Sequence, residues 1–192
     1  MSGKYQNKYR IASARLSSWD YCSNVGYFIT ICTANREHYF GQIINGIIQL
    51  SEQGSMADHC WSQIPNHFSF AVLGEWVIMP NHIHGIIVIN KPRNDNDLPG
   101  VETGHALSLQ TSDDSQPQKP HPRFRNPGKN SISSMVGSFK SAVTKYCNEN
   151  KLPFGWQTRF HDHIIRDNDE FERIKHYIIN NPASWEKDKL FK

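Results

Sequence analysis

Residues 77–89 read V-I-M-P-N-H-I-H-G-I-I-V-I, and this stretch predicts two consecutive strands with a short break between them. Apolar, β-branched runs lie on both sides of the break, and such runs are typical of buried strands. Pro80 and Asn81 form the break, because both residue types favour turns. We therefore expect one strand over residues 68–79 and another over residues 82–90.

Two histidines begin the second of these strands. Side chains two positions apart in a strand point to the same face, so His82 and His84 project together while Ile83 points to the other face. Neutral imidazole is a common ligand of divalent metals. The pair therefore indicates either a metal site or two histidines on a polar strand face, and the pair alone does not decide between them.

Further strands and helices are expected on both sides of this stretch. The pattern predicts a strand over 27–33, a hairpin over 41–50 around Asn45-Gly46, a helix from Ser51 to about Ile64 that Pro65 ends, a helix over 134–146, a strand or extended segment over 160–166, and a last helix from Asp167 to the residue before Pro182. Strands and helices mixed in this order predict an α+β fold with an antiparallel sheet covered by helices.

A change of composition separates the two halves of the chain. Residues 91–130 hold six of the ten prolines and few apolar side chains. Such a segment cannot bury enough surface to offset the entropy lost on ordering. We expect it to be a disordered loop inserted into one domain that spans residues 1–192.

Composition excludes several classes of protein. The 192 residues suit a single domain, and 38% hydrophobic residues are enough for a core. No apolar run is long enough to span a bilayer, and the N-terminus lacks the apolar segment of a signal peptide. We therefore expect a cytoplasmic protein without membrane contact. Its four cysteines, which form no C-x-x-C pair, are expected to be reduced thiols: Cys22, Cys32, Cys60 and Cys147.

The net charge of +3 hides a strongly uneven distribution. Residues 1–16 carry four basic side chains and no acid, and residues 115–166 carry nine lysines or arginines against two acids. The remainder of the chain is acidic. Local charge attracts phosphates, so the two basic stretches are compatible with a nucleic-acid partner.

The last expected helix contains a second group of reactive side chains. Tyr177 and Asn181 are four residues apart and therefore share one helix face. A phenol beside an amide oxygen offers a nucleophile next to a ligand for a hard metal ion. The alternative is a tyrosine packed in the core near a helix end. Tyr146 competes as a nucleophile, and the amide four residues after Tyr177 favours Tyr177.

A second H-x-H pattern occurs at His161 and His163. Its central residue is Asp162, so it lacks the apolar centre of the first pattern. It could contact DNA, support the first metal site, or form a rival metal site.

The ordered set of motifs resembles one family. H-I-H at residues 82–84 looks like the HUH motif (His, hydrophobic, His) of single-tyrosine transposases, and residues 155–166 and 177–182 also look like that group. Residues 15–21 and 27–33 fit the same pattern. Together they resemble the REP-associated tyrosine transposases, relatives of the IS200/IS605 family, over about residues 10–90 and 131–185.

The resemblance implies a fold, a cofactor and a site. The fold would be the ferredoxin-like HUH endonuclease fold, and the cofactor would be Mg²⁺ or Mn²⁺. Tyr177 would be the nucleophile, forming a 5′-phosphotyrosine intermediate, and His82, His84 and Asn181 would bind the metal. Many IS200/IS605 members have a longer Gln where this chain has Asn181.

The resemblance also implies the substrate, which would be single-stranded or hairpin DNA carrying repeated palindromes. Such a protein would be associated with a bacterial nucleoid. Relatives act as monomers or as dimers, so the resemblance does not decide whether this chain forms a homodimer. Basic and aromatic side chains suited to phosphates and unstacked bases are expected to bind the DNA: Arg10, Arg15, Arg123, Arg125, Lys140, Lys145, Trp156, Arg159, His163 and Arg166.

Three other functions are compatible with parts of the pattern. The chain could be a related HUH nickase of replication or plasmid transfer, a DNA-binding protein that keeps the fold without catalysis, or a metal hydrolase that uses His82 and His84 with His161 or His163. Each position that the transposase resemblance requires is filled, which favours an enzyme.

Overall fold

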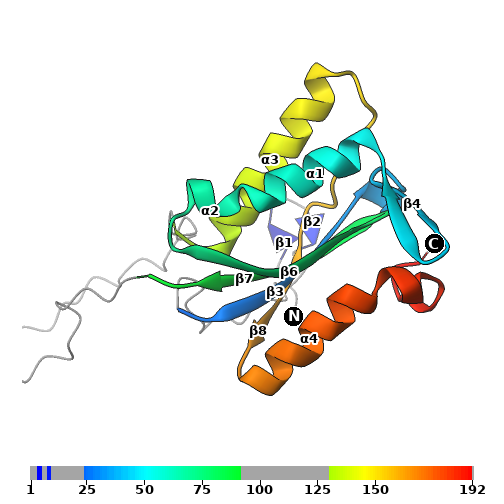
Figure 1. Cartoon of the computed structure of the whole chain (residues 1–192). Coiled ribbons are helices and arrows are strands. Elements are labelled where there is room, and N and C mark those ends of the chain that lie inside the picture. The colour runs from blue at the N-terminus through cyan, green and yellow to red at the C-terminus, as the bar shows by residue number, and fades with distance from the viewer. Residues whose placement is uncertain (1–3, 6–7, 10–23, 92–129, 192) are drawn as a thin grey trace, which may run out of the picture.

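The computed structural model describes residues 4–5, 8–9, 24–91 and 130–191. Its centre is a four-stranded antiparallel sheet with the strand order β6-β7-β3-β8. The expectation of an α+β fold with an antiparallel sheet is confirmed (Figure 1). The four strands are β3 (Gly26–Cys32), β6 (Ala71–Met79), β7 (His82–Ile89) and β8 (His161–Ile165).

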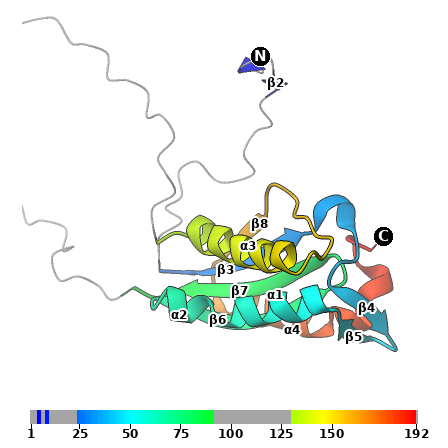
Figure 2. The same ribbon diagram turned by 90° about the horizontal axis from the view of Figure 1, so that it is seen from above.

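Helices cover both faces of this sheet. On one face lie α1 (Glu52–Ser62), α2 (Ile64–His67) and α3 (Ile132–Glu149), and on the other lies α4 (Asn168–Asn180). Figure 2 shows α1 and α3 side by side above the strands. The sheet therefore has one face in a thick helical layer and one face shared with a single helix.

Alternation along β3 explains these two layers. Tyr27, Ile29 and Ile31 are fully buried and join the core beneath α1 and α3. Phe28 and Thr30 lie between them in sequence and therefore point to the α4 face. Each face of the strand thus has its own partner layer.

Short elements complete the described part of the chain. These are the paired β1 (Lys4–Tyr5) and β2 (Lys8–Tyr9), the 3-10 helix η1 (Ala34–Arg36), the hairpin of β4 (Gly41–Ile44) and β5 (Ile47–Leu50), and the 3-10 helix η3 (Pro182–Lys187). Asn45 and Gly46 form the hairpin turn with positive φ angles of 52° and 75°, as this dipeptide predicts.

Most expected elements occur within a few residues of their expected bounds. Pro65 is an exception to its predicted role, because α1 ends at Ser62 and Pro65 lies in the first turn of α2. A proline is tolerated there, since the first turn needs no amide donor. The inserted segment falls between β7 and α3, and residues 92–129 of it lie outside the described residues.

Within the part of the chain that the structure describes, no helix is both long enough and apolar enough to cross a membrane.

Candidate active site

The two histidines of β7 lie side by side on the α4 face of the sheet. His82 pairs with Cys32 and His84 with Thr30 across the β3–β7 ladder. The centroids of the two imidazole rings are 4.4 Å apart, and both side chains are buried. Ile83 points to the opposite face and joins the main core. The expected orientation of this H-x-H pattern is therefore confirmed.

Asn81 fixes the ring of His82. The Asn81 Nδ2 atom donates to the carbonyl of Leu190 at 2.9 Å, which turns its Oδ1 atom toward His82. His82 Nδ1 lies 2.8 Å from that oxygen and must donate, because an amide oxygen only accepts. The lone pair of His82 is therefore on Nε2. This atom is buried and has no hydrogen-bond partner among the described residues.

Thr30 and Tyr177 contact the two nitrogens of His84. Thr30 Oγ1 is 2.9 Å from His84 Nδ1, and the Tyr177 hydroxyl is 3.2 Å from His84 Nε2. The Phe28 ring packs against both, at centroid distances of 5.1 Å from His84 and 6.1 Å from Tyr177. The phenol expected as nucleophile thus lies directly beside the histidine pair.

The amphipathic pattern of α4 places this tyrosine. Asp167 caps the helix by accepting from the Glu170 amide at 2.8 Å. Ile178 is buried against Ile86 of β7 and Ile165 of β8. Packing of Ile178 against the sheet brings the neighbouring Tyr177 over His84, while 45% of the tyrosine surface stays exposed to solvent.

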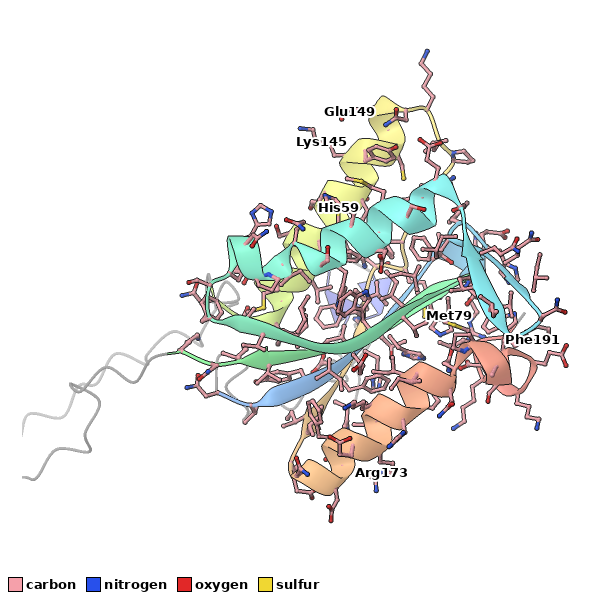
Figure 3. All side chains as sticks on the ribbon, in the orientation of Figure 1. His59, Met79, Lys145, Glu149, Arg173 and Phe191 are labelled. Atoms are coloured by element: carbon pink, nitrogen blue, oxygen red, sulfur yellow. The ribbon has the colours of Figure 1, made fainter. Side chains whose placement is uncertain are left out.

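Asp188, which follows η3, completes the site. Its Oδ2 atom accepts from the Tyr177 hydroxyl at 3.1 Å and from Asn181 Nδ2 at 2.8 Å. Its Oδ1 atom accepts from the Leu190 amide at 2.6 Å. Figure 3 shows Met79, at the end of β6, and Phe191 at the same end of the sheet. The C-terminal segment therefore folds back onto the turn that precedes His82.

Burial shapes the protonation of these groups. It lowers the pKa of His82 to about 3, helped by the neighbouring His84, and lowers the pKa of His84 to about 4. Burial and the Asp188 carboxylate raise the pKa of Tyr177 to about 12. Burial also acts to raise the pKa of Asp188, but hydrogen bonds led by that of Asn181 outweigh it and lower this pKa. At pH 7 the site holds two neutral imidazoles, a neutral phenol and a carboxylate.

These donors fit a divalent cation. Ligand atoms of His82, His84 and Asp188 lie within 4.8 Å of one another, and no other such group of His, Cys, Asp or Glu occurs among the residues that the structure describes. Asn181 Oδ1 is buried there and, like His82 Nε2, lacks a partner within the described ranges. Unsatisfied buried acceptors are costly, so a cation that accepts both lone pairs would stabilise the arrangement. Two imidazoles with oxygen ligands suit a divalent metal ion.

Tyr146 and the second H-x-H pattern lie elsewhere. Tyr146 is on α3, on the opposite face of the sheet, and its hydroxyl donates to Glu52 at 2.8 Å. His161 pairs with Thr30 on the far side from His84, so about two strand spacings (roughly 9–10 Å) separate the two histidines. His163 Nε2 is 2.8 Å from Glu170 Oε1. The geometry thus does not join His161 or His163 to His82 and His84.

Several side chains expected to bind DNA have other contacts. Trp156 packs against Phe40 and Phe154, and its Nε1 atom donates to the Lys140 carbonyl at 3.2 Å. Lys140 donates to the Gln157 carbonyl at 2.6 Å, and Lys145 lies 3.8 Å from Glu149. A DNA contact by any of these residues stays a prediction.

Arg159 and Arg166 are exposed at the two ends of β8. Figure 3 shows Lys145 and Glu149 on the outer side of α3, away from α4. Four further arginines expected at the DNA lie outside the described residues: Arg10, Arg15, Arg123 and Arg125.

Sequence reasoning missed three residues of the site. Thr30 belongs to a strand whose polar face was not assigned, and its register with His84 becomes visible only in the sheet. Asn81 stands next to His82 in the quoted motif, which was a usable signal. Asp188 lies in a charged run near the C-terminus that resembles a solvated tail, so nothing local distinguishes it.

The geometry can be compared with known proteins. The fold is that of a solved REP-associated tyrosine transposase bound to a REP hairpin, with a TM-score of 0.57 and 18% identity over 93% of this chain and 77% of that one. In sequence, the chain is 39% identical over 181 residues to a Haemophilus influenzae protein described as uncharacterized, covering 93% of this chain and 92% of that protein. The chain belongs to the same family as this Haemophilus protein. No family model matches the sequence of this chain.

Proposed function

We propose that this protein is a metal-dependent transposase that nicks and rejoins single-stranded or hairpin DNA through a 5′-phosphotyrosine intermediate. One observation carries the proposal: the Tyr177 hydroxyl lies 3.2 Å from His84 and 3.1 Å from Asp188, inside a group of residues suited to a metal ion. The fold shared with a transposase bound to a DNA hairpin supports it.

The metal would be held by His82, His84 and Asp188, with the Asn181 amide oxygen as a further ligand. When bound, such an ion supplies positive charge that polarises a phosphate diester and stabilises charge on its oxygens. The protein contributes the fixed rings of His82 and His84. Their low pKa values keep both imidazoles neutral and available as ligands at pH 7.

Tyr177 would carry the covalent step. Its Oη atom attacks phosphorus and forms a bond to the 5′ phosphate, while the bond between phosphorus and the 3′ oxygen breaks; the leaving 3′ oxygen takes a proton from solvent and becomes a 3′ hydroxyl. The phenol is neutral before the attack because its pKa is raised to about 12. Its proton therefore has to leave, and Asp188 Oδ2, which already accepts it in a hydrogen bond, is in place to take it.

Rejoining would be the reverse of this step. A 3′ hydroxyl attacks the phosphotyrosine, the new diester forms, and the phenol recovers its proton. The energy of the broken diester bond is kept in the phosphotyrosine, so no nucleotide cofactor is required.

A stem-loop DNA with single-stranded flanks is the substrate we infer. The basic stretches around the site in sequence suit phosphates, and exposed His163 and Arg166 extend along the edge of the sheet. A DNA substrate also favours association with a bacterial nucleoid.

A gel assay tests the proposal. Labelled stem-loop oligonucleotides from a library with randomised flanks are incubated with protein and Mn²⁺ or Mg²⁺, denatured and separated. We expect a covalent protein–DNA adduct that disappears with EDTA. Tyr177→Phe should abolish the adduct, while anisotropy still detects DNA binding.

Tyr146→Phe is the matched control, because Tyr146 is also a helical tyrosine but lies on the other face of the sheet. It should form the adduct at the wild-type rate. Persistence of the adduct in Tyr177→Phe would refute the assigned nucleophile. Cleavage without any adduct would indicate a hydrolase, and binding without cleavage would indicate a DNA-binding protein.

A further inference from the structure

The turn that follows β3 has an unusual backbone. Asn35 and Arg36 have φ angles of 52° and 57°, so two consecutive residues with side chains adopt the left-handed conformation. This conformation is unfavourable for residues with a Cβ atom, and asparagine tolerates it better than arginine does. Such local strain persists only where surrounding contacts enforce it, and it occurs often at functional sites.

Contacts to the candidate active site enforce the turn. Thr33 is fully buried; its amide donates to the carbonyl of Asn81 at 2.9 Å, and its hydroxyl oxygen lies 3.0 Å from the same carbonyl. The same hydroxyl lies 2.7 Å from the carbonyl of Glu37 at the end of the turn. Asn81 also orients His82. The turn is therefore attached to the residue that holds the histidine ring.

This attachment places the Arg36 guanidinium beside the site. Its Nη1 atom donates to the Lys189 carbonyl at 3.4 Å, and the preceding residue, Asp188, accepts from the Tyr177 hydroxyl. The positive charge of Arg36 also contributes to the lowered pKa of His82, after burial and His84. Arg36 and Tyr177 thus contact adjacent residues of the C-terminal segment.

The charge of Arg36 is not neutralised there. Its side chain is half-buried, yet no carboxylate among the described residues lies within ion-pair distance, and the Lys189 carbonyl is its one hydrogen-bond partner in the same set. A guanidinium has five N–H donors in a planar fork that matches the oxygens of a phosphate. The Arg36 guanidinium is half-buried, has unused donors and lies near Tyr177 and the candidate metal site. It is therefore suited to bind an anion.

We propose that Arg36 is a phosphate-binding residue whose guanidinium contacts the DNA backbone within one nucleotide of the scissile bond. The inference rests on the proposed function, because it takes DNA as the ligand. The turn fixes the backbone of Arg36, and the hydrogen bond to the Lys189 carbonyl orients its guanidinium, so part of the conformational freedom of this side chain is already lost before DNA binds. Arg36 would hold the strand while Tyr177 attacks.

Glycine substitution separates the charge from the backbone. Arg36→Gly removes the guanidinium, and glycine adopts a φ of 57° without strain. Asn35→Gly relaxes the same turn and keeps the guanidinium, so it is the matched control. Arg173→Gln removes an arginine whose side chain is 73% exposed on α4 and controls for net charge; Figure 3 shows Arg173 on the outer side of that helix.

Binding to stem-loop DNA is measured by anisotropy in Mn²⁺, with a neutral methylphosphonate at each phosphate of the single-stranded flank in turn. We expect Arg36→Gly to weaken binding to unmodified DNA about ten- to a hundredfold. It should also lower the slope of log affinity against log salt by about 0.7. At the contacted phosphate, the methylphosphonate and Arg36→Gly should weaken binding no more together than either does alone. Both control variants should bind like the wild type.

The assignment would be overturned if, at every flank phosphate, the methylphosphonate and Arg36→Gly weakened binding independently, so that their effects multiplied. Wild-type DNA affinity in Arg36→Gly would overturn it as well. The assignment would also be contradicted if the phosphate coupled to Arg36 lay more than one nucleotide from the phosphate to which Tyr177 becomes linked. If the wild-type protein forms no adduct, the proposed function is refuted. The coupling between Arg36 and a flank phosphate can still be measured then, because anisotropy needs no covalent step. If no stem-loop DNA binds at all, both proposals fail.

Discussion

The Tyr177 hydroxyl donates a hydrogen bond to Asp188 Oδ2 at 3.1 Å, across the end of α4. The bond joins the phenol to a carboxylate that also accepts from Asn181 Nδ2 at 2.8 Å. One carboxylate therefore connects the nucleophile expected from the sequence to the amide expected as a metal ligand. The pKa of Tyr177 is raised partly by this negative charge. Asp188 therefore contacts the phenol and also belongs to the candidate metal site.

Replacing Asp188 by Asn should change both properties. The carboxylate ligand is lost, so Mn²⁺ affinity measured by calorimetry should fall at least about tenfold. The pKa of Tyr177 should also fall toward the ordinary value, because the negative charge that favours the neutral phenol is gone. An absorbance titration compared with Tyr177→Phe isolates that phenol from the other tyrosines.

Glu186→Gln is the control for this change, because Glu186 is an exposed acid of η3 outside the site. It should leave the Mn²⁺ affinity and the phenol titration unchanged. Unaltered Mn²⁺ affinity in Asp188→Asn would remove Asp188 from the ligand set.

Thr30→Val should weaken metal binding without removing a ligand. Thr30 Oγ1 shares a 2.9 Å hydrogen bond with His84 Nδ1, which fixes the ring and leaves Nε2 toward the site. Partners of this kind typically contribute a factor of about 10 to 100 in metal affinity. Calorimetry with Mn²⁺ should show that loss, whereas Thr30→Ser, which keeps the hydroxyl, should bind nearly as the wild type does. Equal affinities of all three proteins would show that Thr30 does not position the ligand.

The histidine pair should make the fold sensitive to acid. In the folded protein the pKa values are about 3 and 4, whereas both groups have a pKa near 6.5 when unfolded. Between about pH 6.5 and 4 the unfolded chain binds more protons, so stability falls as pH falls. Each histidine should lower the free energy of unfolding by roughly 1.4 kcal/mol per pH unit in this range. Urea unfolding in EDTA between pH 7 and 5 measures the slope.

His84→Asn is the reference for this measurement, since it removes one titrating ring and should reduce the slope by about one half. A wild-type slope no steeper than that of His84→Asn would contradict a neutral, buried His84.

The fold was more predictable from sequence than the site. The buried strand β7 and the amphipathic helix α4 follow from local periodicity, which also predicts that His82 and His84 share one strand face. The roles expected for these histidines and for Tyr177 came from the resemblance to single-tyrosine transposases. Turn chemistry also predicted the Asn45-Gly46 hairpin. Pro65 shows the limit of such rules, because its effect depends on whether it falls inside a helix or in a first turn.

The rest of the site depends on contacts between distant parts of the chain. Thr30 meets His84 only through strand register, and Asn81 meets Leu190 only because the C-terminus folds back over the sheet. Asp188 has no periodic pattern around it, and its role comes from the three hydrogen bonds that it accepts there. Residue pairs separated by 54 to 109 positions leave no signal in one sequence.

Gly85, next to His84, should tolerate no side chain. A Cβ atom there would lie 2.4 Å from Trp61 Cζ2 and 3.0 Å from Trp76 Cβ, so α1 would have to move away from β7. Overpacking of this kind costs about 1–3 kcal/mol, and urea unfolding of Gly85→Ala should show a loss in that range. Trp61→Phe removes the clashing indole atoms, so the double variant should lose less stability than the two single variants lose together.

Gly137→Ala is the control, because no atom lies within 4 Å of a Cβ at that helical position. It should stabilise the protein by up to about 1 kcal/mol through helix propensity. Full additivity of Gly85→Ala and Trp61→Phe would mean that the tryptophan does not press against β7 at the position next to His84.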